Sequence, residues 1–338
     1  MRKTRRPTQE DVARRAGVSR ATVSLVLNQT EGQVPIGAET RERVVRAARE
    51  LSYSPNPVAQ MLARGTKNHI IGFLSFDDIF LLEESDFYYR YLVGVQRVAI
   101  ELNHHILLLT NNSEIYQNGM NSLLLADGVI LTGANPNQDV IRRLAKDKFP
   151  FVLLGQCDGL EHEIDSVQSD HEPASYEATY HLLNLNHRSL GIVVDDLELP
   201  HHRLRLEGIQ RAIREVSDAR LTIITGRELE TEGQFKEILQ TYGITALLCA
   251  HRNFTRPAIS LIHRLSLKIP TDISVVFLSD IWGVPVNSPT RVKLNRDLAG
   301  QVAMQRLMER LDGKVENYEQ ILIPCDLIIG ETTAPIRL

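Results

Sequence analysis

The chain has 338 residues, of which 43% are hydrophobic and 24% charged, a composition typical of a globular protein with two or three folded units. No stretch is apolar over the length needed to cross a bilayer, and no apolar segment follows the basic N-terminal residues. We therefore expect a cytoplasmic protein that does not insert into a membrane. Three cysteines, Cys157, Cys249 and Cys325, show neither zinc-motif nor disulfide-framework spacing, so we interpret them as buried hydrophobic residues.

The net charge of −4 averages two unlike parts of the chain. Through Lys67 there are thirteen Lys and Arg against six Asp and Glu, a net charge of +7, which leaves −11 for the remainder. A basic first part is typical of a segment that contacts a polyanion, although a solvated basic tail gives the same count. Charge alone does not separate these two interpretations.

The first thirty residues contain the pattern of two short helices joined by a tight turn. Thr8 can cap a helix that begins at Gln9, with the carboxylate of Asp11 in the capping-box position. Gly17 supplies the left-handed residue of the turn, and Ser19 can cap a second helix. Two helices so joined form a helix-turn-helix, whose second helix enters the major groove of DNA.

The periodicity of apolar residues separates the inner and outer faces of these helices. In the second helix Val23 and Leu27 are expected to face inward, and Arg20, Ala21, Ser24 and Leu25 outward. We assign the following residues to the core of this part: Val12, Ala16, Val18, Val23 and Leu27.

A third helix is predicted over residues 38–51, with Val44, Ala48 and Leu51 on its core face. After Tyr53, residues 57–65 have Asn56 as a helix cap and Pro57 as a first helical residue. This segment is only about two turns long, too short to be stable alone in water. It is therefore expected to become helical only when another structure holds it.

These residues together resemble the LacI/GalR (lactose repressor) family of transcription regulators. Three runs carry the resemblance: Thr8…Asp11-Val12-Ala13…Ala16-Gly17-Val18-Ser19…Thr22-Val23-Ser24…Leu27-Asn28, then Thr40-Arg41-Glu42-Arg43-Val44, then Leu51-Ser52-Tyr53-Ser54-Pro55-Asn56…Ala59…Leu62-Ala63.

The resemblance implies a role in DNA binding for particular residues. Arg20 and Ala21 match positions that read base edges, whereas Leu25 stands where the third reader is usually arginine, which leaves the operator sequence open. Leu62 matches a leucine that wedges into the minor groove. Gly37 replaces the usual capping serine of the third helix. The remaining positions assigned to DNA binding, most of them on the phosphate backbone, are Thr8, Ser19, Thr22, Ser24, Asn28, Thr40, Tyr53, Asn56 and Ala59.

From residue 69 onward, short apolar runs alternate with amphipathic segments. Runs of this kind suit strands buried on both faces of a parallel sheet, and repeated strand–helix units give doubly wound α/β layers. The strand-like runs are residues 70–74, 106–109, 128–131, 151–154, 191–194, 221–224, 246–249 and 273–277. The helical stretches include residues 91–101, 172–185, 205–216 and 256–265.

This body also resembles the family, in its effector domain of the periplasmic-binding-protein type. The matching runs include Asp127-Gly128-Val129-Ile130, His187-Arg188, Arg205-Leu206-Glu207-Gly208 and Ile269-Pro270-Thr271-Asp272-Ile273. The resemblance implies two lobes that exchange chain, the first taking residues ~68–167 and a piece near ~295–325.

The expected fold is therefore a small all-α helix-turn-helix head followed by a two-lobed α/β body of doubly wound parallel sheets. The expected divisions are a DNA-binding domain over residues 1–55, a hinge helix and linker over 56–67, and an effector-binding and dimerisation domain over 68–338.

The expected cleft between the lobes departs from the family pattern. Arg205 matches an arginine that reaches a ligand oxygen, but Gly155, His251-Arg252 and Ser279 replace polar ligand positions. His201, Arg203, Arg205 and His251 give the cleft a positive charge. These changes indicate an anionic effector, such as a phosphorylated sugar or a carboxylate, and the alternative is a cleft that has lost ligand binding. Phe87 matches an aromatic position near the cleft mouth, although core or dimer packing is the other interpretation.

The sequence thus predicts a sequence-specific DNA-binding regulator, a repressor and homodimer, that binds a pseudo-palindromic operator with effector-dependent affinity. A solute-binding protein for transport shares the body but needs a signal peptide and no basic head. An enzyme with a fused DNA-binding head is the third possibility, but the motifs of nucleotide binding, nucleophilic catalysis and zinc proteolysis are missing. No cofactor and no metal are expected.

The wedge assignment of Leu62 generates a test. Leu62→Ala should weaken specific operator binding by an amount on the order of a few kcal/mol, because the wedge stabilises the bent duplex. Weak, salt-dependent binding should be spared, because phosphate contacts supply it. Titrations of operator and random duplex at several salt concentrations measure both modes, and an equal loss of both would contradict the assignment.

Overall fold

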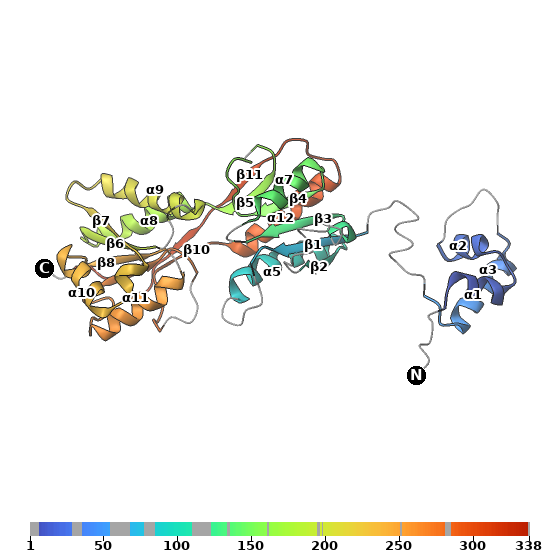
Figure 1. Cartoon of the computed structure of the whole chain (residues 1–338), viewed down its shortest axis with the longest axis horizontal. Coiled ribbons are helices and arrows are strands. Elements are labelled where there is room, and N and C mark those ends of the chain that lie inside the picture. Colours follow the sequence, from blue (N-terminus) through green and yellow to red (C-terminus); the bar gives the residue numbers. More distant parts are fainter. Residues whose placement is uncertain are drawn as a thin grey trace. The chain divides into compact units, whose positions relative to one another are not determined.

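The computed structural model describes residues 7–28, 36–54, 68–77, 85–109, 123–133, 136–160, 162–194, 197, 199–250, 252–280 and 285–336. The chain divides into two compact units, Met1–Asn68 and His69–Leu338, and each is described by itself (Figure 1). Within this described part, no helix has the length and apolar character of a membrane span.

The first unit, the head, contains three helices: α1 (Gln9–Ala16), α2 (Arg20–Asn28) and α3 (Ala38–Glu50). The predicted caps are confirmed, since Asp11 N–H donates to Thr8 Oγ1 and Thr8 N–H donates to the Asp11 carboxylate. Gly17 ends α1 with φ at 64°, a left-handed conformation that glycine adopts without strain. Ser19 Oγ then accepts the Thr22 N–H at 3.1 Å, which caps α2.

The core of the head is formed by apolar residues from all three helices, and it differs from the prediction in α2. Val12, Val23 and Val44 are fully buried at its centre. Val26, which the sequence pattern did not place inward, is also buried, whereas Leu27 is only partly buried against the same cluster. In α2, the pair Val23 and Val26, three residues apart, therefore contributes more to this small core than the pair Val23 and Leu27, four residues apart.

The first lobe of the second unit is built on a fully parallel sheet in the order β11-β5-β4-β3-β1-β2. Its strands are β1 (Ile70–Ser75), β2 (His105–Leu109), β3 (Gly128–Thr132), β4 (Phe151–Leu154), β5 (Asp165–Ser169) and β11 (Gln320–Ile323). A short 3-10 helix, η1 (Leu123–Leu125), precedes β3.

Helices cover both faces of this sheet (Figure 1). One core joins α5 (Ser85–Glu101) and α12 (Arg296–Leu311) to the strands, and a second core lies under α7 (Gln138–Lys146). The helices α5 and α12 approach closely at glycines. A Cβ placed on Gly94 would lie 2.0 Å from the Asp297 carbonyl oxygen, so no larger residue fits there without moving the helix.

The second lobe repeats this plan, with a sheet in the order β12-β10-β9-β8-β6-β7. All its neighbouring pairs are parallel except β10 with β12. Its strands are β6 (Ser189–Val193), β7 (Arg220–Ile224), β8 (Ala246–Cys249), β9 (Ser274–Phe277), β10 (Arg291–Lys293) and β12 (Asp326–Ile328).

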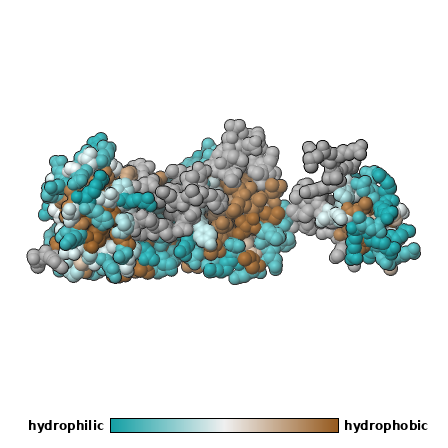
Figure 2. Space-filling model, turned by 90° about the horizontal axis from the view of Figure 1, so that it is seen from below, coloured by the Kyte–Doolittle hydropathy of each residue, from teal (hydrophilic) through white to brown (hydrophobic). Residues whose placement is uncertain are grey.

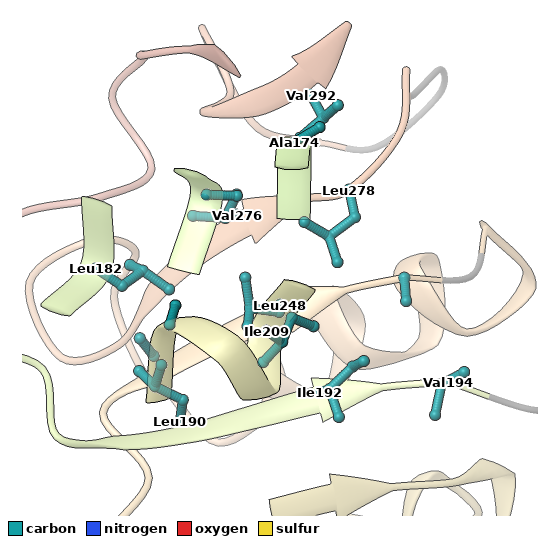
Figure 3. Close-up of a cluster of buried hydrophobic side chains, with 14 of the residues drawn as sticks. Ala174, Leu182, Leu190, Ile192, Val194, Ile209, Leu248, Val276, Leu278 and Val292 are labelled. Atoms are coloured by element: carbon teal, nitrogen blue, oxygen red, sulfur yellow. The ribbon is translucent and has the colours of Figure 1, made fainter. Parts of the chain in front are cut away.

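The helices of this lobe are α8 (His171–Asn184), α9 (Pro200–Arg214), α10 (Glu232–Thr241) and α11 (Arg252–Arg264), with a 3-10 helix η2 (Gly226–Leu229). Figure 3 shows the core on the α8 and α9 side, where Leu182 of α8 and Ile209 of α9 belong to one buried cluster with Ile192 and Leu248 of the sheet. The other face is filled by a separate cluster under α10 and α11.

The chain passes from the first lobe to the second after β5, returns after β10 to form α12 and β11, and passes back before β12. This order confirms the expected exchange of chain between the lobes. Two of the crossing segments are joined directly, because Ser169 Oγ donates to the Leu294 carbonyl oxygen at 3.2 Å.

Each of the eight predicted strand runs coincides with a strand, and the four predicted helical stretches coincide with α5, α8, α9 and α11; where the C-terminal ends differ, they differ by one or two residues. The elements that the sequence reading missed are the strands β5, β10, β11 and β12 and the helices α7, α10 and α12. The missed strands are short or carry polar residues, so they lack the continuous apolar run that marks a buried strand.

A buried ionic cluster holds α12 to β5 in the first lobe. Asp165, 1% exposed at the start of β5, accepts from Arg306 Nε at 2.9 Å and also from Arg310 Nε. The Glu319 N–H donates to the same carboxylate at 3.0 Å. Both arginines further donate to the Asn317 carbonyl oxygen, which fixes the segment before β11.

Asp165→Ala is predicted to lower the free energy of unfolding by about 3–5 kcal/mol, because it leaves buried guanidinium groups without their carboxylate. A matched control is Asp147→Ala, whose partner Arg143 lies 3.7 Å away with both side chains about half exposed. Since exposed pairs contribute about 0–1 kcal/mol, the control should change little. Urea unfolding followed by circular dichroism measures both changes, and equal effects would show that the Asp165 cluster is not a major constraint.

Candidate functional site

The exposed N-terminal end of α2 is the candidate DNA-contacting surface of the head. Arg20 and Ala21 are exposed there, and Ser24 and Leu25 are partly exposed one turn farther along. The short side chain of Ala21 leaves the backbone accessible, which suits close approach to base edges in the major groove.

Several predicted phosphate-contacting residues already have partners within the head. The Thr8 hydroxyl donates to the Asp11 carboxylate at 2.7 Å, and the Ser19 and Thr22 hydroxyls lie 2.9 Å apart. Tyr53 packs against the core of the head. Both Tyr53 and Thr40 are partly exposed. These groups keep α1 and α2 in place, and a hydroxyl retains acceptor capacity for a further bond.

The head also carries exposed arginines on α1 and α3. On α3, Arg41, Arg43 and Arg49 are exposed, and on α1, Arg15 forms an ion pair with Glu50 at 2.7 Å that ties α1 to α3. Guanidinium groups of this kind neutralise DNA phosphates and supply binding that does not depend on base sequence. Gly37 begins α3 without a side-chain cap, as predicted.

Some predicted site residues lie outside what the structure describes. For DNA binding these are Asn56, Ala59, Leu62 and the side chain of Asn28. For the effector they are His251 and the side chains of Phe87 and Arg252.

A cavity of about 410 Å³ lies between the two lobes, a volume within the range that small-molecule ligands occupy. The first lobe contributes residues from the carboxyl ends of its strands, among them Thr132, Gln156 and Ser169. The second lobe contributes the start of α9, including His201 and Arg205. The cavity thus brings together Arg205, His201 and Ser279, three of the predicted effector residues.

Arg205 is the dominant charge of this cavity. It is 5% exposed, and its Nη1 donates to the Ala250 carbonyl oxygen at 2.6 Å, while Nε has no partner among the described residues. Burial, and then the nearby Arg296, lower the pKa of Arg205 to about 10. The guanidinium therefore remains charged at neutral pH, and none of the described residues forms an ion pair with it.

A group of histidines that the sequence reading did not identify as a cluster stands next to Arg205. His171 at the start of α8 and His201 have ring centroids 6.0 Å apart, and His201 and His202 are 4.2 Å apart. The pKa of His171 lies well below its usual value, first because burial disfavours the charged ring and then because Arg205 and His201 are close. His171 was missed because the strand before it, β5, was missed.

Ser279 has a different environment from the one the sequence suggested. Arg296 Nη2 donates to Ser279 Oγ at 3.2 Å, and Arg296 Nη1 pairs with Asp280 at 2.6 Å. The Arg296 side chain is fully buried, so Asp280 compensates its charge. Ser279 lines the cavity, but both it and Asp280 also hold Arg296.

Family models match nearly the whole chain. Residues 8–56 match bacterial regulatory proteins of the lacI family, and residues 69–190 match periplasmic binding proteins and the sugar binding domain of the LacI family. Residues 179–333 match a periplasmic binding protein-like domain.

Individual relatives cover the same length. The HTH-type transcriptional repressor PurR of Haemophilus influenzae (strain PittEE) is 28% identical over 97% of this chain and 99% of its own. The regulator YvdE of Bacillus subtilis (strain 168) is 26% identical over 96% and 99%. A solved lac repressor dimer bound to operator and the anti-inducer ONPF superposes with a TM-score of 0.74, at 27% identity over 98% of this chain and 100% of that chain.

The helix-turn-helix head and the two-lobed body define a transcription regulator that carries an effector-binding domain, and not an enzyme. The chain belongs to the LacI family.

The pKa of His171 predicts how stability depends on pH. An unfolded histidine takes up a proton near pH ~6.5, whereas folded His171 does so only at lower pH, so the unfolded state binds more protons below ~6.5. Stability should therefore fall as pH falls from about 7 to about 5, by up to about 1.4 kcal/mol per pH unit for this group.

His171→Gln should make the melting temperature fall less over this range than in the parent protein. His181 and His187, whose pKa values burial also lowers, remain in both proteins and serve as the internal control. Melting curves at several pH values measure the difference, and parallel curves for parent and variant would mean that His171 titrates normally.

Proposed function

We propose that this protein is a cytosolic, homodimeric repressor that binds a pseudo-palindromic operator and changes its affinity when an anionic effector occupies the interlobe cavity. The division of labour that we propose is DNA reading by residues 1–55, a hinge over 56–67, and effector binding and dimerisation over 68–338. The relatives named as repressors and the operator-bound lac repressor support the DNA-binding part.

The observation that carries the effector part is the uncompensated charge of Arg205. Among the described residues that line the cavity, Asp158 is the one carboxylate, and it is paired with Arg203 at 2.5 Å. Neutral sugars are bound largely through hydrogen bonds from their hydroxyls to acceptors, carboxylates above all, and the one carboxylate among the described lining residues is already engaged by Arg203. A phosphate or carboxylate would instead receive the buried guanidinium donor and restore charge balance.

An exposed apolar area on the first lobe supports the dimer. Figure 2 shows a hydrophobic patch on one face of this lobe. The helix α5 packs beside the edge strand β2, and these two elements carry Ile100 at 66% exposure, Tyr89 at 57% and Leu108 at 44%. Large apolar areas of this kind mark protein–protein contacts, and the lac repressor structure is a dimer.

The DNA-binding proposal is tested by selecting binding sites from a randomised duplex library with the purified full-length protein. We expect a pseudo-palindrome whose half-sites are about one helical turn apart, because each protomer of a dimer inserts one recognition helix. Arg20→Ala should relax the preference at one position of each half-site by about 1–3 kcal/mol. Recovery of single, unpaired half-sites would contradict the dimer, and recovery of unselected DNA would contradict specific reading by α2.

The effector proposal is tested by calorimetry with hexose phosphates, sugar acids and the neutral sugars from which they derive. Phosphorylated or acidic compounds should bind and their neutral parents should not. Arg205→Met should weaken the binding of the anions by about 10- to 100-fold, because a charge-assisted hydrogen bond is lost. Binding of neutral sugars alone would overturn the anionic effector, and binding of none would indicate an effector-independent regulator.

A further inference from the structure

Gln156 enters the cavity from the first lobe. It follows β4 after Gly155, whose φ of 135° is a conformation that favours glycine, and whose N–H donates to the Val167 carbonyl oxygen at 2.9 Å. This bend at the end of a buried strand places the side chain of Gln156 among the residues that line the cavity.

The orientation of the Gln156 amide is fixed by its neighbour Asp158. Gln156 Nε2 donates to Asp158 Oδ1 at 3.1 Å, and Asp158 Oδ2 accepts from Arg203 Nη2 at 2.5 Å. The carboxylate oxygens of Asp158 act as acceptors in both bonds, so the amide turns its NH₂ group toward them. Since Arg203 lies on α9, this chain of bonds also connects the two lobes.

The other end of the amide, Gln156 Oε1, is buried and has no hydrogen-bond partner among the described residues. A buried acceptor without a partner costs free energy that a ligand donor would recover. In the second lobe, Arg205 Nε is a buried donor in the same situation. Two residues that line the cavity therefore each carry a buried polar atom without a partner among the described residues, an acceptor on the first lobe and a charged donor on the second.

We propose that Gln156 is a specificity-determining residue, which accepts a hydrogen bond from a hydroxyl or amino group of the effector while Arg205 binds its anionic group. This inference rests on the proposed function and narrows it: the effector is a hydroxylated or amino-bearing anion, and not a simple acid or phosphate. Asp158 and Arg203 are positioning residues that hold the acceptor toward the ligand.

The test uses the full-length protein with glucose 6-phosphate, 6-phosphogluconate and malate, together with their derivatives that lack one hydroxyl, such as 2-deoxyglucose 6-phosphate and succinate. For a parent compound that binds, one deoxy derivative should bind at least tenfold more weakly. Gln156→Met should weaken the binding of the parent compound by a similar factor and leave the affinity for that deoxy derivative unchanged. Removing the hydroxyl and removing the Gln156 amide abolish the same hydrogen bond.

Gln138→Met is the matched control. Gln138 lines the same cavity, but its Oε1 already accepts from Arg142 at 3.1 Å, so its loss should not change the discrimination between parent and derivative. Asp158→Ala is the second variant. This substitution frees the Gln156 amide to rotate and should reduce the discrimination between parent compound and deoxy derivative. The Asp158–Arg203 ion pair is about half exposed, so its loss should change the melting temperature little.

The outcomes separate this inference from the proposed function. One outcome is that the protein without substitutions binds the anions, and that the Gln156→Met variant binds each anion and each deoxy derivative with the same affinity as that protein. In that case Gln156 is not the specificity determinant, and the proposal of an anionic effector stands. If the parent protein binds none of the anions, both proposals are wrong.

Discussion

The geometry of the first lobe depends on the ionic interaction of the Asp165 carboxylate with Arg306 and Arg310. It joins β5 to α12, whose Arg306 is 141 residues farther along the chain, and through Asn317 and Glu319 it also fixes the approach to β11. Because β5 ends at Ser169 and leads directly into His171, this anchor at the start of the strand sets where its other end meets the cavity. The pocket is thus positioned by an ionic cluster at the opposite end of β5.

The cavity combines two costs that a ligand can remove together. Arg205 is buried with no ion-pair partner in the part of the chain that the structure describes, and Gln156 Oε1 is buried there with no donor. Arg296, in contrast, is equally buried but has Asp280, and Asp158 has Arg203. The compensated charges maintain the structure, whereas the uncompensated groups are the ones available for recognition.

Much of the fold could be predicted because buried parallel strands have a strong signal. Runs such as Val152-Leu153-Leu154 are apolar at every position, and all eight predicted runs, which are wholly or mostly apolar, coincide with strands to within two residues. The strand β5, with the sequence Asp165-Ser166-Val167-Gln168-Ser169, has no such signal, since its polar residues are buried by tertiary bonds that sequence alone does not reveal.

The DNA-contacting surface and the cavity could be predicted to different degrees, because contacts between residues close in sequence leave a signal and contacts between distant residues do not. The head is local in sequence, so the caps at Thr8 and Ser19 and the exposed end of α2 followed from spacing. Arg205 was found through the family resemblance. Gln156 and His171 were not found, because their importance arises from cross-lobe contacts and from the end of an unpredicted strand. The apolar face of α2 also differed, with Val26 in place of Leu27 at the centre of the core.

The exchange of chain between the lobes has a consequence for synthesis on the ribosome. The core of the head lies within the first 53 residues, so this part has all its internal contacts soon after it leaves the exit tunnel. The first lobe lacks α12 and β11 until residues 296–323 have been translated, and the apolar surface that Ala299, Ala303 and Leu307 later cover stays open until then. Neither lobe is complete before residues 320–328, which form β11 and β12, have been translated. A nascent or truncated polypeptide therefore acquires its DNA-reading surface first and its capacity to sense a metabolite last.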